Sequence, residues 1–172
     1  MNPTAFIWTE PRFWLIAVTV AIFMEFWAML LHGKLWHGPW WGAHRSHHEP
    51  RTGWFEFNDV FAVMHAVIAM TLIIGGLEAK AGEATLVAVA VGIGMSMFGM
   101  VYFTVHDGLI HGRLPVQFLS RIDWFRRVRN AHLAHHHRDA EPYGLFLGQW
   151  ELRRALQRQK VNAGSHLPPT SP

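Results

Sequence analysis

Three long apolar runs constrain the fold of this chain more than any other feature. They cover residues 13–31, 60–77 and 84–105, and Glu25 is the one charged residue within them. At 1.5 Å per residue, a helix of about 20 residues crosses the ~30 Å hydrocarbon core of a bilayer. An ordinary soluble core does not need three such runs in a chain of 172 residues. The runs therefore predict an all-α integral membrane protein with three transmembrane helices.

The segments outside the apolar runs suggest the domain organisation. In residues 116–129 the apolar side chains fall on one helical face, which predicts an amphipathic helix at the membrane surface, with a fourth transmembrane helix as the alternative. Residues 161–172 are rich in Pro, Ser and Thr, and we expect a disordered tail there. Residues 1–160 are then a single membrane domain.

The distribution of charge predicts an orientation in the membrane. Only six residues, 78–83, separate the second and third runs, so these two helices form an antiparallel hairpin. All Lys and Arg residues except Arg12 and Lys80 then lie on one side of the membrane. The positive-inside rule makes that side cytoplasmic. We therefore expect a protein of a bacterial inner membrane, with the lipid bilayer as a partner. The net charge of +3 is thereby a topology signal, and no nucleic-acid partner is needed to explain it.

Histidine is the compositional outlier, with 13 residues. Ten of them form two copies of one pattern, in which a pair spaced five apart is followed by HxxHH. The first copy consists of His32, His37, His44, His47 and His48, and the second of His106, His111, His132, His135 and His136. The predicted topology gathers all ten on the cytoplasmic side. His65, His137 and His166 lie outside the pattern, and we expect no ligand role for them.

The spacing of these histidines is typical of metal ligands. Residues at i, i+3 and i+4 of a helix share a face, so we expect each HxxHH to direct three imidazoles toward one spot. A pair five apart diverges by roughly 140° on an ideal helix. Such a pair either serves two different metals or lies in a helix that is locally wound wider. Ten imidazoles exceed the needs of one ion, which favours a histidine-rich cap with two metals of four or five ligands each.

The donor set restricts the metal. Imidazole suits Zn, Cu, Fe and Ni. The absence of cysteine excludes Cys-ligated zinc and thiolate-held iron–sulfur clusters, and the chain has neither Glu-x-x-His nor His-Glu-x-x-His. We therefore expect two iron ions, with zinc as a possible substitute. Asn58, Asp59 and Asp107 are candidates to accept hydrogen bonds from the ligands, although Asn58 and Asp59 are equally suited to cap a helix. No catalytic side chain is expected beyond the metal centre.

Several stretches of the chain resemble one enzyme family. They are His32-Gly-Lys-Leu-Trp-His37, His44-Arg-Ser-His-His-Glu-Pro-Arg51, Phe55-Glu-Phe-Asn-Asp59, Val105-His-Asp-Gly-Leu-Ile-His111, Ala131-His-Leu-Ala-His-His136 and Pro142-Tyr-Gly-Leu-Phe-Leu-Gly148. Together they resemble the non-haem β-carotene 3-hydroxylases of the fatty acid hydroxylase superfamily, from about residue 23 to residue 152. The resemblance implies an integral-membrane di-iron monooxygenase whose ten patterned histidines are the metal ligands. The chain has no plastid transit extension, which favours a bacterial membrane.

The resemblance also implies a reaction. The substrate would be a β-ring carotenoid, hydroxylated at C3 with O2 to give β-cryptoxanthin and zeaxanthin. Electrons would come from ferredoxin or an NAD(P)H-linked donor, because the chain carries no nucleotide-binding fingerprint or redox-cofactor motif of its own. The alternatives are a fatty-acyl or sterol hydroxylase or desaturase of the same superfamily, a non-enzymatic membrane metal-binding protein, or a bis-His haem protein. The apolar runs carry few polar ligands, which disfavours a metal transporter.

Overall fold

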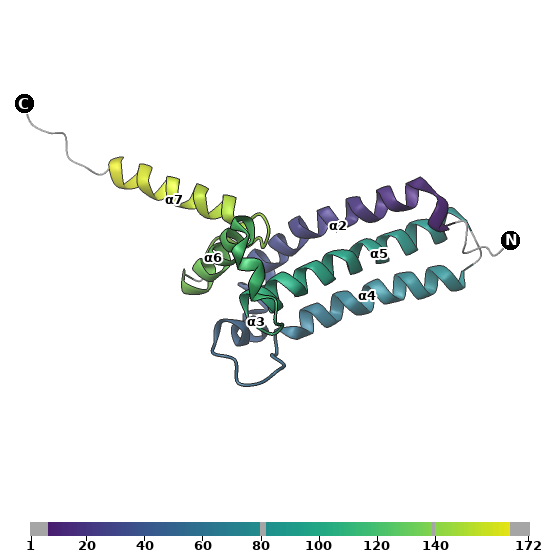
Figure 1. Cartoon of the computed structure of the whole chain (residues 1–172), viewed down its shortest axis with the longest axis horizontal. Coiled ribbons are helices and arrows are strands. Elements are labelled where there is room, and N and C mark those ends of the chain that lie inside the picture. Colours follow the sequence, from purple (N-terminus) through teal and green to yellow (C-terminus); the bar gives the residue numbers. More distant parts are fainter. Residues whose placement is uncertain (1–6, 80–81, 139, 166–172) are drawn as a thin grey trace, which may run out of the picture.

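The computed structural model of the protein describes residues 7–79, 82–138 and 140–165, and its regular elements within those ranges are all helical (Figure 1). In chain order they are α2 (Pro11–Leu31), the π-helical η1 (His32–Trp36), α3 (Trp41–His48), α4 (Asp59–Glu78), α5 (Glu83–Phe103), the π-helical η2 (Thr104–Ile110), the 3₁₀ segment η3 (Gln117–Arg121), α6 (Asp123–Arg138) and α7 (Gly148–Ser165). We refer to residues 37–58, between η1 and α4, and to the described residues of 111–165, after η2, as the cap.

Three helices are long and apolar enough to cross a membrane: Pro11–Trp36, Asp59–Glu78 and Glu83–Ile110. The prediction of three spans is therefore confirmed. No fourth such span lies in the described part of the chain. The prediction of a single helix over residues 116–129 is wrong, because the backbone of Ile122 is extended and separates η3 from α6.

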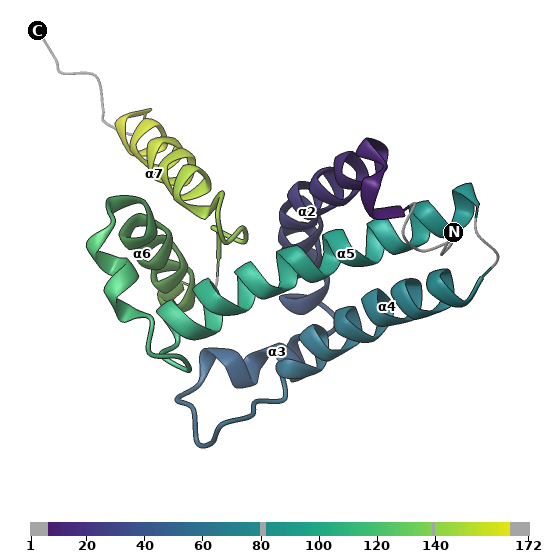
Figure 2. The same ribbon diagram turned by 45° about the vertical axis from the view of Figure 1, so that its right-hand side comes forward.

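Helix α5 is the centre of the membrane domain and packs against both α2 and α4 (Figure 2). Its glycines permit this close approach. A methyl group on Gly94 would lie 2.5 Å from the carbonyl oxygen of Ala17 in α2, and one on Gly92 would lie 2.7 Å from that of Ala69 in α4. Small residues are the usual means by which membrane helices reach backbone contact, since lipid supplies no hydrophobic drive between them.

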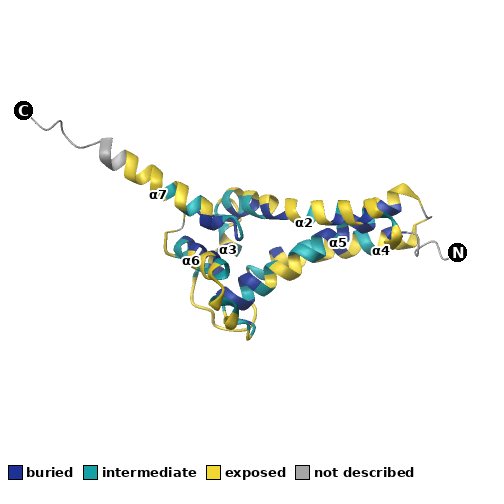
Figure 3. Ribbon diagram, turned by 45° about the horizontal axis from the view of Figure 1, so that its top comes forward, coloured by how far each residue is buried: buried dark blue, intermediate teal, exposed yellow. Residues whose placement is uncertain are grey.

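The outer faces of these helices are exposed, as Figure 3 shows for the long arms of the molecule, and their exposed side chains are apolar. Only Phe61, Ala69 and Gly76 are buried among the 20 residues of α4. The exposed large side chains of α2 and α4 include Leu15, Ile22, Phe23, Val63, Val67 and Ile74. An apolar surface of this extent is not found on a soluble monomer and indicates contact with lipid.

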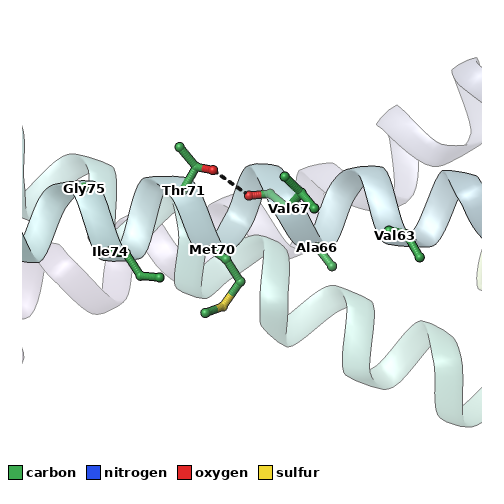
Figure 4. A pocket seen from close by; sticks show the side chains of 7 residues that line it. All are labelled: Val63, Ala66, Val67, Met70, Thr71, Ile74 and Gly75. Carbon is green, nitrogen blue, oxygen red and sulfur yellow. Dashed lines mark hydrogen bonds between the residues drawn. The ribbon is translucent and has the colours of Figure 1, made fainter.

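One apolar groove of about 520 Å³ runs along this lipid-facing side of α4 (Figure 4). It is lined by Val63, Ala66, Val67, Met70, Thr71, Ile74 and Gly75. Its hydroxyl group, on Thr71, donates to the carbonyl oxygen of Val67 in the same helix (2.8 Å). The groove thus offers surrounding acyl chains an apolar surface and contains no patterned histidine.

The cap lies at the end of the spans where α2 and α5 continue into their π-helical segments, and α7 is the part of the cap that projects away from the spans (Figure 1). Val128 of α6 and Leu145 of the cap pack in one buried cluster with Val105, Leu109 and Ile110 of η2. This cluster joins the cap to the span that α5 begins. Helix α7 continues to Ser165, past the domain boundary that the sequence suggested at residue 160. The rest of the predicted tail, with His166, lies outside the described residues, as does Lys80.

Candidate metal centre

In the two histidine pairs spaced five apart, His32 and His106 lie in the π-helical segments at the ends of two spans, and His37 and His111 directly follow these segments. The backbone N–H of His37 donates to the carbonyl of His32, and that of His111 to the carbonyl of His106, both at 3.0 Å. This i→i+5 bond widens the helical turn, so both members of each pair face the same side. Of the two alternatives that the sequence left open, the structure shows the wider winding.

The two HxxHH motifs do not direct all their rings to one spot, so that expectation is wrong. In each motif the i and i+4 histidines join one group, and the i+3 histidine joins the other. The reason is geometric: at 100° per residue, positions i and i+4 are about 40° apart, whereas i+3 and i+4 are about 100° apart. His47 of α3 thus joins the group that contains His132 and His136 of α6, and His135 of α6 joins the group that contains His44 and His48 of α3.

Two compact groups result. The first histidine group consists of His32, His37, His44, His48 and His135, and the second of His47, His111, His132 and His136. Within each group, one ring nitrogen from every member lies within 4.8 Å of those of the others. His106 adjoins the second group, with its Nε2 3.0 Å from that of His47. The structure therefore brings together all ten patterned histidines, and either group could hold a metal ion.

Three rings of the first group are fixed by neutral acceptors. Each donates a hydrogen bond from Nδ1 to an oxygen: His32 to the carbonyl of Tyr143 (2.8 Å), His44 to Oδ1 of Asn58 (2.7 Å) and His135 to the carbonyl of Ala140 (2.8 Å). Because a carbonyl or amide oxygen only accepts, the proton of each neutral ring is on Nδ1. The lone pair is then on Nε2, which is the atom that turns toward the centre of the group.

Carboxylates do the same for the second group. Nδ1 of His47 donates to Glu56, and that of His106 donates to Asp107, both at 3.1 Å. Arg113, only 8% exposed, gathers these acids, since its guanidinium lies 3.3 Å from Glu56 and 3.0 Å from Asp107. It also lies 2.8 Å from Asp59. One buried cation thus bridges three carboxylates and keeps two of them directed at histidine rings.

This arrangement fits a cation in each group. Nε2 of His32 lies 3.0 Å from Nε2 of His44, and both rings already carry their proton on Nδ1. The same is true of His47 and His106 at 3.0 Å. Two lone pairs facing each other at this distance cannot form a hydrogen bond, and a metal ion between such nitrogens removes the repulsion.

Three of these rings, those of His44, His111 and His136, also remain neutral, which is the state that binds metal. Burial lowers the pKa of His44 to about 3 and that of His136 to about 2. Burial likewise lowers the pKa of His111 to about 2, and the neighbouring ring of His106 adds to the effect. At neutral pH these side chains therefore present lone pairs rather than charges.

The structure places the three predicted acceptors differently. Asn58 and Asp107 contact patterned histidines directly, His44 and His106 respectively. Asp59 contacts no histidine in the described structure: it accepts from Arg113 and from the backbone N–H of Glu56 (3.0 Å). Neither Asn58 nor Asp59 provides a side-chain cap for α4.

Sequence reasoning missed Glu56, Arg113 and Tyr143. Glu56 stands in the polar stretch immediately before α4, and Arg113 follows His111 by two residues, so their position near the motifs was the available signal. The ring of Tyr143 contacts three rings of the first group, with centroids 5.5–5.7 Å apart. Outside both groups, His65 accepts from Trp27 Nε1 (3.3 Å), and His137 is exposed on α6.

Comparison with known proteins identifies the family. Residues 17–152 match the family model described as fatty acid hydroxylase. The chain belongs to the fatty acid hydroxylase family. No solved structure matches it significantly.

Relatives of this fatty acid hydroxylase chain carry more specific names. It is 46% identical over 139 residues to beta-carotene hydroxylase 1, chloroplastic, of Capsicum annuum, covering 80% of this chain and 44% of the relative. It is 45% identical over 148 residues to beta-carotene 3-hydroxylase 2, chloroplastic, of Arabidopsis thaliana, covering 85% and 48%. A beta-carotene hydroxylase of Pantoea ananas is 43% identical over 122 residues, covering 71% and 67%. The chain spans about half the length of the chloroplast relatives.

The crossing of His47 and His135 predicts which double variants lose both metal ions. The variant His47→Ala/His111→Ala removes two ligands from one group, so about one ion per chain should remain. The variant His44→Ala/His47→Ala damages both groups, although its residues belong to one motif, and should reduce both ions. Metal content of the purified protein measures this, with His137→Ala as the control that keeps both ions. A His44→Ala/His47→Ala protein that retains one fully bound ion would contradict the crossing.

Proposed function

We propose that this chain is a membrane monooxygenase that hydroxylates C3 of the β-ionone rings of β-carotene, giving β-cryptoxanthin and then zeaxanthin. Each turnover would consume O2, two electrons and two protons and release water. The observation that carries the proposal is the pair of histidine groups whose Nε2 lone pairs converge, in a chain similar to beta-carotene hydroxylases over most of its length. An unactivated ring C–H bond needs a cofactor of this kind, because side chains alone do not oxidise it.

The proposed cofactor is a pair of iron ions held by the ten patterned histidines. When bound, the irons would supply the activation of O2. Zinc is a possible substitute, because imidazole binds it well and the affinity order does not favour Fe(II). The chain itself contributes the neutral rings, the Nδ1 hydrogen bonds that orient them, and the burial that excludes water from most of them.

The position of the groups suits a substrate that is dissolved in the bilayer. His32 directly follows α2, and His106 lies in the π-helical continuation of α5. Both groups are therefore at the end of the apolar spans. A long apolar polyene lying between or beside these spans would present one ring to the metals without leaving the hydrocarbon region. The remaining polyene of the substrate is apolar, so the spans would need no polar group to bind it.

We place the cap on the cytoplasmic side, in a bacterial inner membrane, on the basis of charge. Residues 117–165 contain nine Lys and Arg residues but only four Asp and Glu residues. Basic segments that flank transmembrane helices are retained in the cytoplasm.

The same basic surface is a candidate docking site for an electron donor. The chain has no cysteine and no nucleotide-binding fingerprint, so electrons would come from another protein, either ferredoxin or an NAD(P)H-linked carrier. Arg121, Arg126 and Arg127 are exposed on η3 and α6, close to the histidines of α6. An acidic carrier would be steered toward this surface, and the steering would weaken as salt shortens the Debye length.

A second candidate is a fatty-acyl or sterol hydroxylase, which the description of the matching family model favours. The fold and metal groups suit any apolar substrate within the bilayer. The names of the relatives are the reason to prefer a carotenoid.

Expression in a host that accumulates β-carotene separates these candidates. The proposal predicts new peaks of β-cryptoxanthin and zeaxanthin by chromatography, because the host supplies substrate, O2 and a generic electron donor. The His44→Ala variant should reduce them to the level of the empty host, whereas His137→Ala should leave them unchanged. Hydroxylated fatty acids or sterols, with β-carotene untouched in the presence of stably inserted protein, would favour the second candidate.

Docking at the basic surface predicts a salt-dependent defect in a charge-reversal variant. In Arg121→Glu/Arg126→Glu, ferredoxin-driven turnover at low donor concentration should fall about tenfold and lose its dependence on ionic strength. Metal content should stay normal. Arg12→Glu, at the opposite end of the spans, is the control for added negative charge. If turnover in the double variant keeps the wild-type salt dependence, the donor does not dock on this surface.

A further inference from the structure

We propose that Glu25, the charged residue within the first membrane span, is a positioning residue for the first histidine group. It acts through the loop 143–147, which it binds from the membrane side. The inference rests on the proposed metal centre and goes beyond it, because it assigns a role to a carboxylate that contacts none of the histidines.

Glu25 is only 6% exposed, and its Oε1 accepts two backbone hydrogen bonds from a distant part of the chain. The N–H of Phe146 donates at 2.7 Å and that of Leu147 at 2.9 Å. An ionisable residue in a membrane helix is costly and is retained where it binds a specific partner. The partner here is the backbone of the loop, which would otherwise have two unsatisfied N–H groups at half-buried residues.

The loop is bound by a second carboxylate, that of Glu151 in α7. Its Oε2 accepts from the N–H of Tyr143 (3.1 Å) and of Gly144 (2.6 Å). A methyl group on Gly144 would lie 2.9 Å from this oxygen and 3.1 Å from Oε1 of Glu25. The two carboxylates therefore clamp the loop, and the clamp closes only because residue 144 has no side chain.

The clamped loop reaches the first histidine group at His32. The carbonyl of Tyr143 accepts the Nδ1 hydrogen bond that fixes the proton of this ring. His32 follows Glu25 by seven residues, which is about two helical turns, so both lie on one face of the helix. At the next residue, a methyl group on Gly33 would lie 2.9 Å from the Tyr143 ring, which shows how closely this helix and the loop are packed.

The hydrogen bonds that orient rings of the second histidine group come from residues outside this loop. The acceptors that the structure gives for His47 and His106 are Glu56 and Asp107, which Arg113 gathers from a different part of the cap. Releasing the loop should therefore weaken one metal position and leave the other intact. Loss of an outer hydrogen-bond partner typically costs 10–100-fold in metal affinity.

The test compares Glu25→Leu with Glu25→Gln in the full-length protein, loaded with iron or zinc and titrated with a competing chelator. In Glu25→Leu, one of the two ions should be lost at about 10–100-fold lower chelator concentration, with the other unchanged. In Glu25→Gln, the amide oxygen can still accept both N–H bonds, so both ions should be retained. Unchanged affinity in Glu25→Leu, equal weakening of both ions, or a Glu25→Gln protein as weak as Glu25→Leu would overturn the proposal.

Double variants assign the weakened ion. Glu25→Leu/His44→Ala combines two changes at the first group and should still hold about one ion. Glu25→Leu/His111→Ala combines changes at both groups and should hold neither ion tightly. The reverse pattern would place the effect of Glu25 at the second group and contradict the route through Tyr143.

A substitution in the loop keeps the inference testable if Glu25→Leu does not insert or fold. Gly144→Ala, which lies outside the membrane spans, should weaken the binding of the same single ion, because the added methyl group moves the loop away from both carboxylates. Gly99→Ala is the matched control, since a methyl group there meets no atom within 4 Å. Wild-type protein that binds no ions would contradict the metal centre itself, whereas two ions in wild type and unchanged affinity in Gly144→Ala would contradict the role of the clamp alone.

Discussion

The hydrogen bond from the outer nitrogen of a buried histidine ring is the interaction on which this structure depends. His32, His44, His47, His106 and His135 each donate from Nδ1 to an oxygen, which commits their Nε2 lone pairs to the interior of a group. Without those oxygens the rings would be free to rotate or to exchange tautomers, and Nε2 of one ring could donate to Nε2 of its neighbour instead of offering a lone pair to a metal. The cap can be understood as the means of bringing five acceptors, from segments far apart in sequence, to the end of three membrane helices.

The two groups differ in how their acceptors are held. The first relies on backbone carbonyls and an amide, which carry no net charge, and on a loop clamped between two glutamates. The second relies on carboxylates, which make a donor ring more basic, with Arg113 as the compensating charge. His47 and His135 each link one group to the helix that builds the other, so neither group is complete until α3 and α6 have come together.

Much of the fold and of the candidate site was predictable from sequence because it depends on local periodicity. Hydropathy located the spans to within a few residues, and spacing identified the ten histidines that the structure gathers. The crossing of His47 and His135 was not predicted, because the shared face of an HxxHH motif is broad and only the tertiary position of a second helix divides it. The role of the Tyr143 and Ala140 carbonyls as acceptors could not be predicted from sequence, since any residue type offers the same backbone oxygen. Arg113 and Glu56 carry no spacing rule, and their role follows only from the approach of α4 to the end of α5.

Diffraction at the absorption edge of the bound metal tests the central claim most directly. Crystals of the metal-loaded protein should show two anomalous peaks, one within about 2.0–2.2 Å of Nε2 of His44 and His135 and the other equally close to Nε2 of His47 and His132. A single peak, or two peaks with His44 and His47 bound to the same ion, would contradict the crossed arrangement and the account built on it.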